Sequence, residues 1–233
     1  MAAVRRPRMS DARIRRDIGK IYDRFLILPN LRMHMYRVAS VAELLCDRWK
    51  GPSIDKRRII AACLLHDLGN IVKFDLGSRR SIKLLGKSAG RLAYWRRVRR
   101  GVMQKYGANE YTATHNMLEE LRVDRKVVSL IDNMRLALGE AHRSDYALML
   151  CEYADIRVAP EGVVSVRGRF EDFAERYGHS ANPKNRKKAR IVLSRLGTQL
   201  KVEELLFARI RIKPEQVNDR SVKPYLDRYT KRR

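Results

Sequence analysis

Apolar residues recur at helical spacing along most of the chain, and the alternation typical of half-buried strands is nearly absent. Between residues 31 and 49, apolar side chains return at steps of three and four, which places them on one face of a helix. Gly51 and Pro52 are expected to end this helix. A second helix is predicted to begin at about 53–55 and to reach His66.

The helical pattern continues beyond a glycine-containing segment at 70–90, which we predict to be a long loop with a short helix inside it. Only the stretch 159–166 has the features of a short strand. Further helices are predicted at about 91–106, 109–121, 125–138 and 143–157, from near Phe170, and at about 184–208 and 222–229. The predicted fold class is therefore all-α.

Length and composition favour one compact domain, or one domain with a short appendage, with a core of its own. The 233 residues are 45% hydrophobic, which is enough to fill such a core without disulfides. Cys46, Cys63 and Cys151 each lie in an apolar helical pattern and are expected to be reduced thiols. No apolar run approaches the ~18 residues of a membrane span, and the first ten residues do not resemble a signal peptide. We therefore expect a cytoplasmic protein without a membrane partner.

The formal net charge of +25 favours phosphate-bearing partners. Basic residues cluster at 96–100, 79–80 and 186–188, without the interleaved aromatic residues of a base-stacking surface. Each cluster has two interpretations, a solvated helix face and a phosphate-contact surface.

The segment LLHDLGN at 64–70 is the most specific motif in the chain. His66 and Asp67 lie where an apolar helix is predicted to end, with Gly69 as an expected left-handed stop. His34 lies on the flank of the preceding helix, and Asp155 lies at the inner end of a later one. Two imidazoles and two carboxylates suit Mn²⁺, Fe²⁺, Ni²⁺, Co²⁺ or Zn²⁺ better than Ca²⁺.

This ordered set resembles the HD-domain superfamily of metal-dependent phosphohydrolases. HMYRVASVAELL at 34–45 resembles the first helix of that family, and AACLLHDLGN at 61–70 resembles its signature helix. The resemblance covers residues 20–160. It implies an HD-domain helical bundle, and we expect residues 161–233 to form additional C-terminal helices packed on that core.

The resemblance implies that His34, His66, Asp67 and Asp155 bind one divalent metal ion, with Mg²⁺ added to the metals above. Asp67 is expected to be catalytic as well, because its carboxylate can orient the attacking water. His115 lies where larger HD enzymes place a histidine for a second metal. The region 130–138 contains no further histidine, so we favour one metal and leave two roles for His115, a substrate contact or a plain helix-face residue.

Arg37 and Lys73 are the other predicted substrate contacts. Arg37 lies one turn after His34, where it could clamp a phosphate or form a structural ion pair. Lys73 follows the signature, where it could supply charge to a phosphate or be solvated.

Two functions are consistent with these residues. The first is hydrolysis of a phosphate ester, a nucleotide or a related small phosphorylated substrate, by metal-activated water. The alternative is a non-catalytic or phosphodiesterase-type HD protein that binds RNA or nucleotides through its basic surface.

Overall fold

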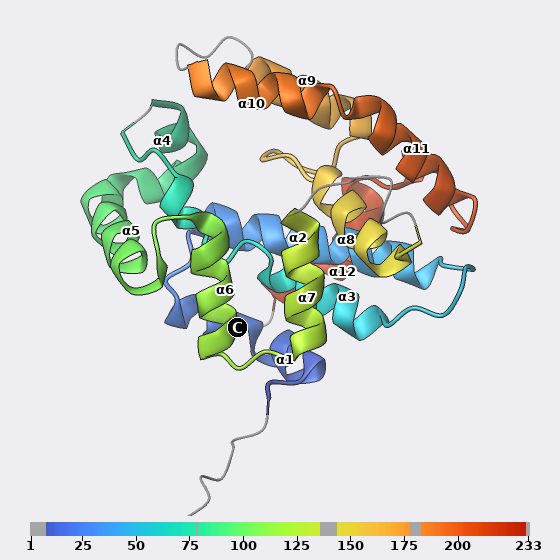
Figure 1. The fold of residues 1–233 in the computed structure, drawn as a ribbon, viewed down its shortest axis with the longest axis horizontal. Coiled ribbons are helices and arrows are strands. Elements are labelled where there is room, and N and C mark those ends of the chain that lie inside the picture. Colours follow the sequence, from blue (N-terminus) through green and yellow to red (C-terminus); the bar gives the residue numbers. More distant parts are fainter. Residues whose placement is uncertain (1–7, 78, 136–143, 178–182, 232–233) are drawn as a thin grey trace, which may run out of the picture. The chain divides into compact units, whose positions relative to one another are not determined.

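The computed structural model describes residues 8–77, 79–135, 144–177 and 183–231, and these are mostly helical (Figure 1). Within these ranges the pairings of β type are isolated bridges, one of them between Val158 and Val163. The all-α prediction is confirmed, but the expected strand at 159–166 is wrong. A tight turn forms there instead, in which the Ala159 amide donates to the Gly162 carbonyl at 2.9 Å.

The chain divides into two compact units. The first contains Met1–Tyr36 and Arg57–Leu136, and the second contains Arg37–Lys56 and Ala137–Arg233. No helix in the described part of the chain has the length and apolar composition needed to span a membrane. The predicted boundaries at 20–160 and 161–233 stay a prediction.

The first unit is built from short helices that pack against one another. Here η1 contacts both α5 and α6, and α6 packs against α5 and α7. Its elements are α1 (Asp11–Arg24), the first part of α2 (Pro29–Asp47), α3 (Lys56–Leu65), η1 (Asn70–Lys73), α4 (Arg79–Leu85), η2 (Gly86–Arg91), α5 (Leu92–Tyr106), α6 (Glu110–Glu120) and α7 (Arg125–Arg135).

Helix α1 is an addition to the predicted elements. Ser10 caps it by accepting a hydrogen bond from the Arg13 amide. Ile14, Ile18 and Ile21 are buried at helical spacing along its inner face. The segment 70–90 is also more ordered than a loop, because η1, α4 and η2 occupy most of it.

The second unit joins the later part of α2 to the C-terminal helices. Within it α9 packs against α10, and α11 packs against both α8 and α9. Its elements are α8 (Tyr146–Ile156), α9 (Val166–Tyr177), α10 (Pro183–Leu193), α11 (Leu196–Phe207), η4 (Pro214–Gln216) and α12 (Asp219–Thr230).

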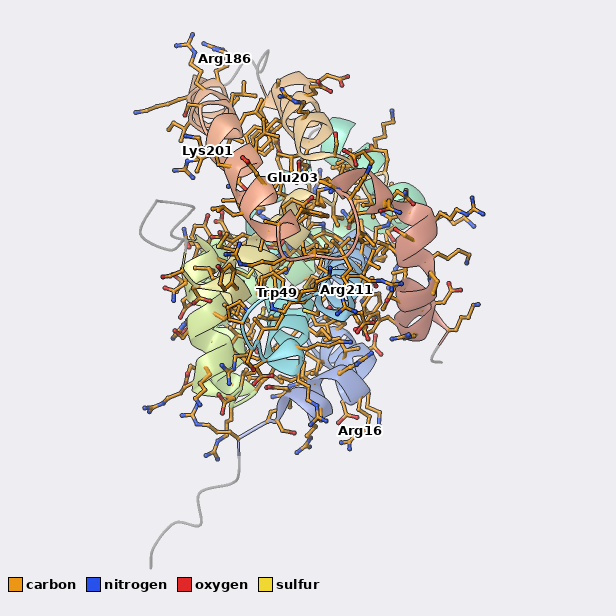
Figure 2. The ribbon with its side chains drawn as sticks, turned by 90° about the vertical axis from the view of Figure 1, so that its right-hand side faces the viewer. Arg16, Trp49, Arg186, Lys201, Glu203 and Arg211 are labelled. Carbon is orange, nitrogen blue, oxygen red and sulfur yellow. The ribbon has the colours of Figure 1, made fainter. Side chains whose placement is uncertain are left out.

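A buried arginine ties these C-terminal elements to α8. The guanidinium of Arg157 donates to the carbonyls of Val217 at 2.6 Å and Pro214 at 3.2 Å. It also lies 3.6 Å from the carboxylate of Glu203 on α11, a residue labelled in Figure 2. These bonds compensate the cost of burying the charge. The C-terminal segment is thus part of the core of its own unit.

The predicted single helix at 184–208 is wrong, since it is broken between α10 and α11. The hydroxyl of Ser194 donates to the Ile191 carbonyl at 2.9 Å, which competes with regular helical bonding. Gly197 follows in the first turn of α11 and further lowers helix propensity. Arg186 and Lys201, labelled in Figure 2, lie on the exposed sides of the two helices.

Candidate metal centre

Helix α3 holds the signature motif in place because the part of the helix that leads to the motif is buried. Every residue from Ile59 to Leu65 is buried, so this part of the helix has no polar face, whereas its first turn, 56–58, is basic and more exposed. The hydroxyl of Tyr22 on α1 donates to the carbonyl of Leu64 at 2.6 Å and satisfies one backbone acceptor at the helix end. His66 and Asp67 follow in the turn between α3 and η1.

Gly69 has a different role from the predicted one. Its φ of −83° is right-handed, so the expected left-handed stop is wrong. A Cβ atom at this position would lie 2.5 Å from the backbone nitrogen of Thr114 and 2.8 Å from the carbonyl oxygen of Glu110. The Gly69 amide also donates to the Thr114 hydroxyl at 2.9 Å. Glycine is required here because helix α6 approaches the backbone of the turn.

The backbone fixes the tautomer of the neutral His66 ring. Its Nδ1 lies 2.9 Å from the carbonyl oxygen of Cys63, one turn earlier on the chain. A carbonyl oxygen only accepts, so Nδ1 carries a proton, and in the neutral ring Nε2 keeps its lone pair. Metal-binding histidines usually have this arrangement, with one ring nitrogen donating to a carbonyl and the other facing the ion. The side chain is 7% exposed, which limits its movement.

His34 and Asp67 complete a cluster of three side chains in the first unit. His34 projects from α2, and its ring centroid lies 5.4 Å from that of His66. The Oδ2 atom of Asp67 lies 3.7 Å from Nε2 of His34 and 3.7 Å from Nε2 of His66. The carboxylate oxygen thus faces both imidazole nitrogens.

The donors of the cluster, and the two separations from Asp67, suit ligands that share one divalent ion. Two atoms bound to one ion by bonds of about 2.1 Å lie at most about 4.2 Å apart. Both separations of 3.7 Å from Asp67 fall within that limit. Imidazole nitrogen with carboxylate oxygen suits transition metals better than Ca²⁺. His34, His66 and Asp67 therefore fit the predicted ion.

Asp155 is the fourth predicted ligand, and it lies in the last turn of α8 in the second unit. Its side chain is half-buried. Its role as a ligand stays a prediction.

The predicted substrate contacts have three different surroundings. Arg37 donates to the carbonyl of Pro160 at 3.1 Å within the second unit. Lys73 ends η1 and is exposed. His115 on α6 has its Nδ1 atom 3.2 Å from Oδ2 of Asp132 on α7. None of the three roles is tested by these contacts.

Two features escaped sequence reasoning. The pairing of His115 with Asp132 joins residues on different helices, and their separation in the chain gives no signal for it. Arg99 belongs to the basic cluster of α5, but its Nε and NH2 groups donate to the Val72 carbonyl at 3.0 and 2.8 Å. It therefore holds the segment after the signature, in addition to contributing charge.

The family model described as HD domain matches residues 31–137. This segment is an HD domain, and the predicted membership in the HD-domain superfamily is confirmed over these residues. The match includes His34, His66 and Asp67 and ends before Asp155. Searches of curated proteins and of solved structures gave no match.

Proposed function

We propose that the protein is a metal-dependent phosphohydrolase that cleaves a phosphate ester with water activated by one divalent ion. The observation that carries this proposal is the convergence of His34, His66 and Asp67, with the Nε2 atom of His66 left as an acceptor by the Cys63 carbonyl. A binding protein without hydrolytic function does not need this donor set.

Each residue of the cluster has a distinct task. His34 and His66 would hold the ion through Nε2, and the backbone contact of His66 orients its ring before the ion binds. When bound, the ion lowers the pKa of its water and neutralises charge on the phosphoryl group. Asp67 would bind the ion through one carboxylate oxygen, while its other oxygen accepts a hydrogen bond from the attacking water and orients it.

Asp155 is proposed as the remaining protein ligand. Its place in the order of the motif supports this role, and its carboxylate would add the negative charge that divalent cations favour. Asp155→Asn keeps the size of the side chain and removes that charge. We expect it to weaken metal affinity, measured by competition with a chelating dye.

The proposed substrate is a small phosphorylated compound, most simply a nucleotide, consistent with the net charge of +25. The alternative is an HD protein that binds RNA or nucleotides without hydrolysing them, and the same positive charge favours it. Metal content separates the two, because only the enzyme requires an ion.

The test combines metal analysis of the purified protein with phosphate release from a panel of nucleotides and phosphate esters in Mn²⁺ or Co²⁺. We expect about one ion per chain and turnover of at least one compound. His66→Ala should lose both, whereas the surface variant Asp17→Asn should keep both. Absence of any divalent ion from the protein, after incubation with these metals, would overturn the proposal.

A further inference from the structure

A basic pocket lies in the first unit, and its lining includes Lys73 but none of the three clustered metal-ligand candidates. It has a volume of about 510 Å³ and is formed by the segment 73–77 and helix α5. Its charged lining consists of Lys73, Arg96, Arg99 and Arg100 against a single carboxylate, Asp75. Pockets of roughly 300–1,000 Å³ hold small-molecule ligands.

Two of the arginines are fixed by the backbone. Arg99 donates from Nε and NH2 to the Val72 carbonyl, and Arg96 donates from NH2 to the Leu76 carbonyl at 3.2 Å. A guanidinium has five N–H donors, so each keeps others for a ligand. Because the backbone already orders these side chains, binding an anion costs them little conformational entropy.

The other two cations are exposed and have no carboxylate at ion-pair distance among the residues that the structure describes. These are Lys73 and Arg100. Oδ1 of Asp75 accepts a hydrogen bond from the Gly77 amide at 3.0 Å. Four cations beside one carboxylate repel one another, and an anion placed among them relieves that repulsion.

The surrounding sequence strengthens the positive field. Residues 68–109 contain eleven lysines and arginines and a single acidic residue, Asp75. One phosphate group carries about two negative charges, which is less than the excess of cations in the pocket. Linked phosphates carry more charge in a compact volume. The only aromatic lining residue is Phe74, so recognition of a base is not the main feature.

We propose that this pocket binds a compact polyphosphate anion, that is, a ligand with two or more linked phosphate groups. The phosphate oxygens accept hydrogen bonds from Arg96 and Arg99, while Lys73 and Arg100 supply further charge. This site goes beyond the hydrolysis proposed above, because anion binding here requires no metal ion.

The test is calorimetric titration of the full-length, metal-free protein with tripolyphosphate in a chelator-containing buffer of low ionic strength. We expect binding by the wild type, and an affinity lowered about tenfold or more in Arg100→Gln and further in the double variant Lys73→Gln/Arg100→Gln. Among the described residues neither side chain has a hydrogen bond or ion pair to another element, so we expect thermal melts to show that the variants are folded.

Arg97→Gln is the matched control. Arg97 is an exposed arginine on α5 outside the pocket lining, so its loss removes the same charge from the same helix. We expect its affinity for tripolyphosphate to stay within about twofold of the wild type. An equal loss of affinity in Arg97→Gln and Arg100→Gln would indicate that tripolyphosphate binds to a diffuse basic face, such as a nucleic-acid backbone would use. That result would overturn the proposed binding site.

Two other results bear on the proposal. No binding of tripolyphosphate by the wild type would overturn it, and so would an equal affinity for orthophosphate and tripolyphosphate. His66→Ala should bind tripolyphosphate like the wild type, because the titration is metal-free. Failure of the hydrolytic proposal therefore leaves this one standing, and the reverse also holds.

Discussion

The end of α3 and the pair α6–α7 each place an imidazole beside a carboxylate, but in different surroundings. His66 is 7% exposed and its Nδ1 atom contacts the backbone, which leaves Nε2 toward Asp67. His115 is 44% exposed, and its Nδ1 atom contacts the Asp132 carboxylate directly. The first arrangement leaves an acceptor nitrogen and a carboxylate oxygen facing one point. In the second arrangement the imidazole and the carboxylate contact each other at the surface.

A histidine beside an aspartate therefore occurs in two different settings within this protein. At the end of α3, by contrast, the buried helix orients the His66 ring through the Cys63 carbonyl. An exposed pair of the second kind contributes little to stability and is screened by salt.

Replacing Asp67 with Ala should reduce activity more than any change at the His115–Asp132 pair. We expect phosphate release to fall by about 10²–10³ or more, because an oriented water and a metal ligand are lost together. The free energy of unfolding of the metal-free protein should change by less than about 0.5 kcal/mol. Assays with saturating metal and thermal melts measure the two effects, and retained activity would remove Asp67 from the site.

A methyl group at Gly69 tests how closely α6 must approach the metal-bearing turn. Gly69→Ala should lower the free energy of unfolding by about 1–3 kcal/mol, because the new Cβ meets the backbone of Glu110 and Thr114. Gly101→Ala is the control, since a Cβ there meets nothing within 4 Å inside α5, and it should stabilise by about 0.5–1 kcal/mol. Urea unfolding gives both values. Equal effects would mean that the approach of α6 is not constraining.

A substitution of His115 tests whether the His115–Asp132 pair contributes to catalysis or to metal binding. His115→Gln should lower kcat/KM by no more than about tenfold, the worth of one hydrogen bond to substrate. The metal content should be unchanged, because the proposed centre holds one ion. Elemental analysis beside steady-state kinetics measures both. Loss of an ion from this variant would indicate a second metal at α6–α7 and would make this pair resemble the end of α3.

The smallest expected effect concerns another surface contact of α6. A hydrogen bond from Lys105, with others from Tyr106 and Arg24, lowers the pKa of Glu120 from 4.5 to about 2. The stability from this carboxylate is therefore fully present above pH 4.5 and is lost as the pH falls toward 2. Because its cationic partners Lys105 and Arg24 are exposed and the pairs are screened by solvent, we expect a contribution to stability of less than about 1 kcal/mol. Glu120→Gln should flatten the acid limb of a stability profile by that amount, and an unchanged profile would contradict the assignment.

Periodicity was sufficient to predict the fold class, and the order of His34, His66, Asp67 and Asp155 was sufficient to predict the HD domain. Single residues that usually end helices were less informative about where the helices end and why. A glycine after a helix usually indicates a left-handed turn, yet Gly69 is required by a segment far away in the chain. The break near Ser194 depends on one side-chain hydrogen bond that apolar spacing does not record. The need for glycine at position 69 and the position of the helix break depend on contacts that a single sequence does not show.

Tyr22 supports the signature helix although it lies outside the residues that match the HD family. The HD match begins at residue 31, whereas Tyr22 is fully buried and its hydroxyl contacts the last turn of α3. A fragment trimmed to the matched residues would leave the Leu64 carbonyl without its donor and would expose the apolar side of α3 to water. A truncated form made for crystallisation or for a fusion should therefore keep α1, because the residues that support the signature helix extend beyond those that identify the family.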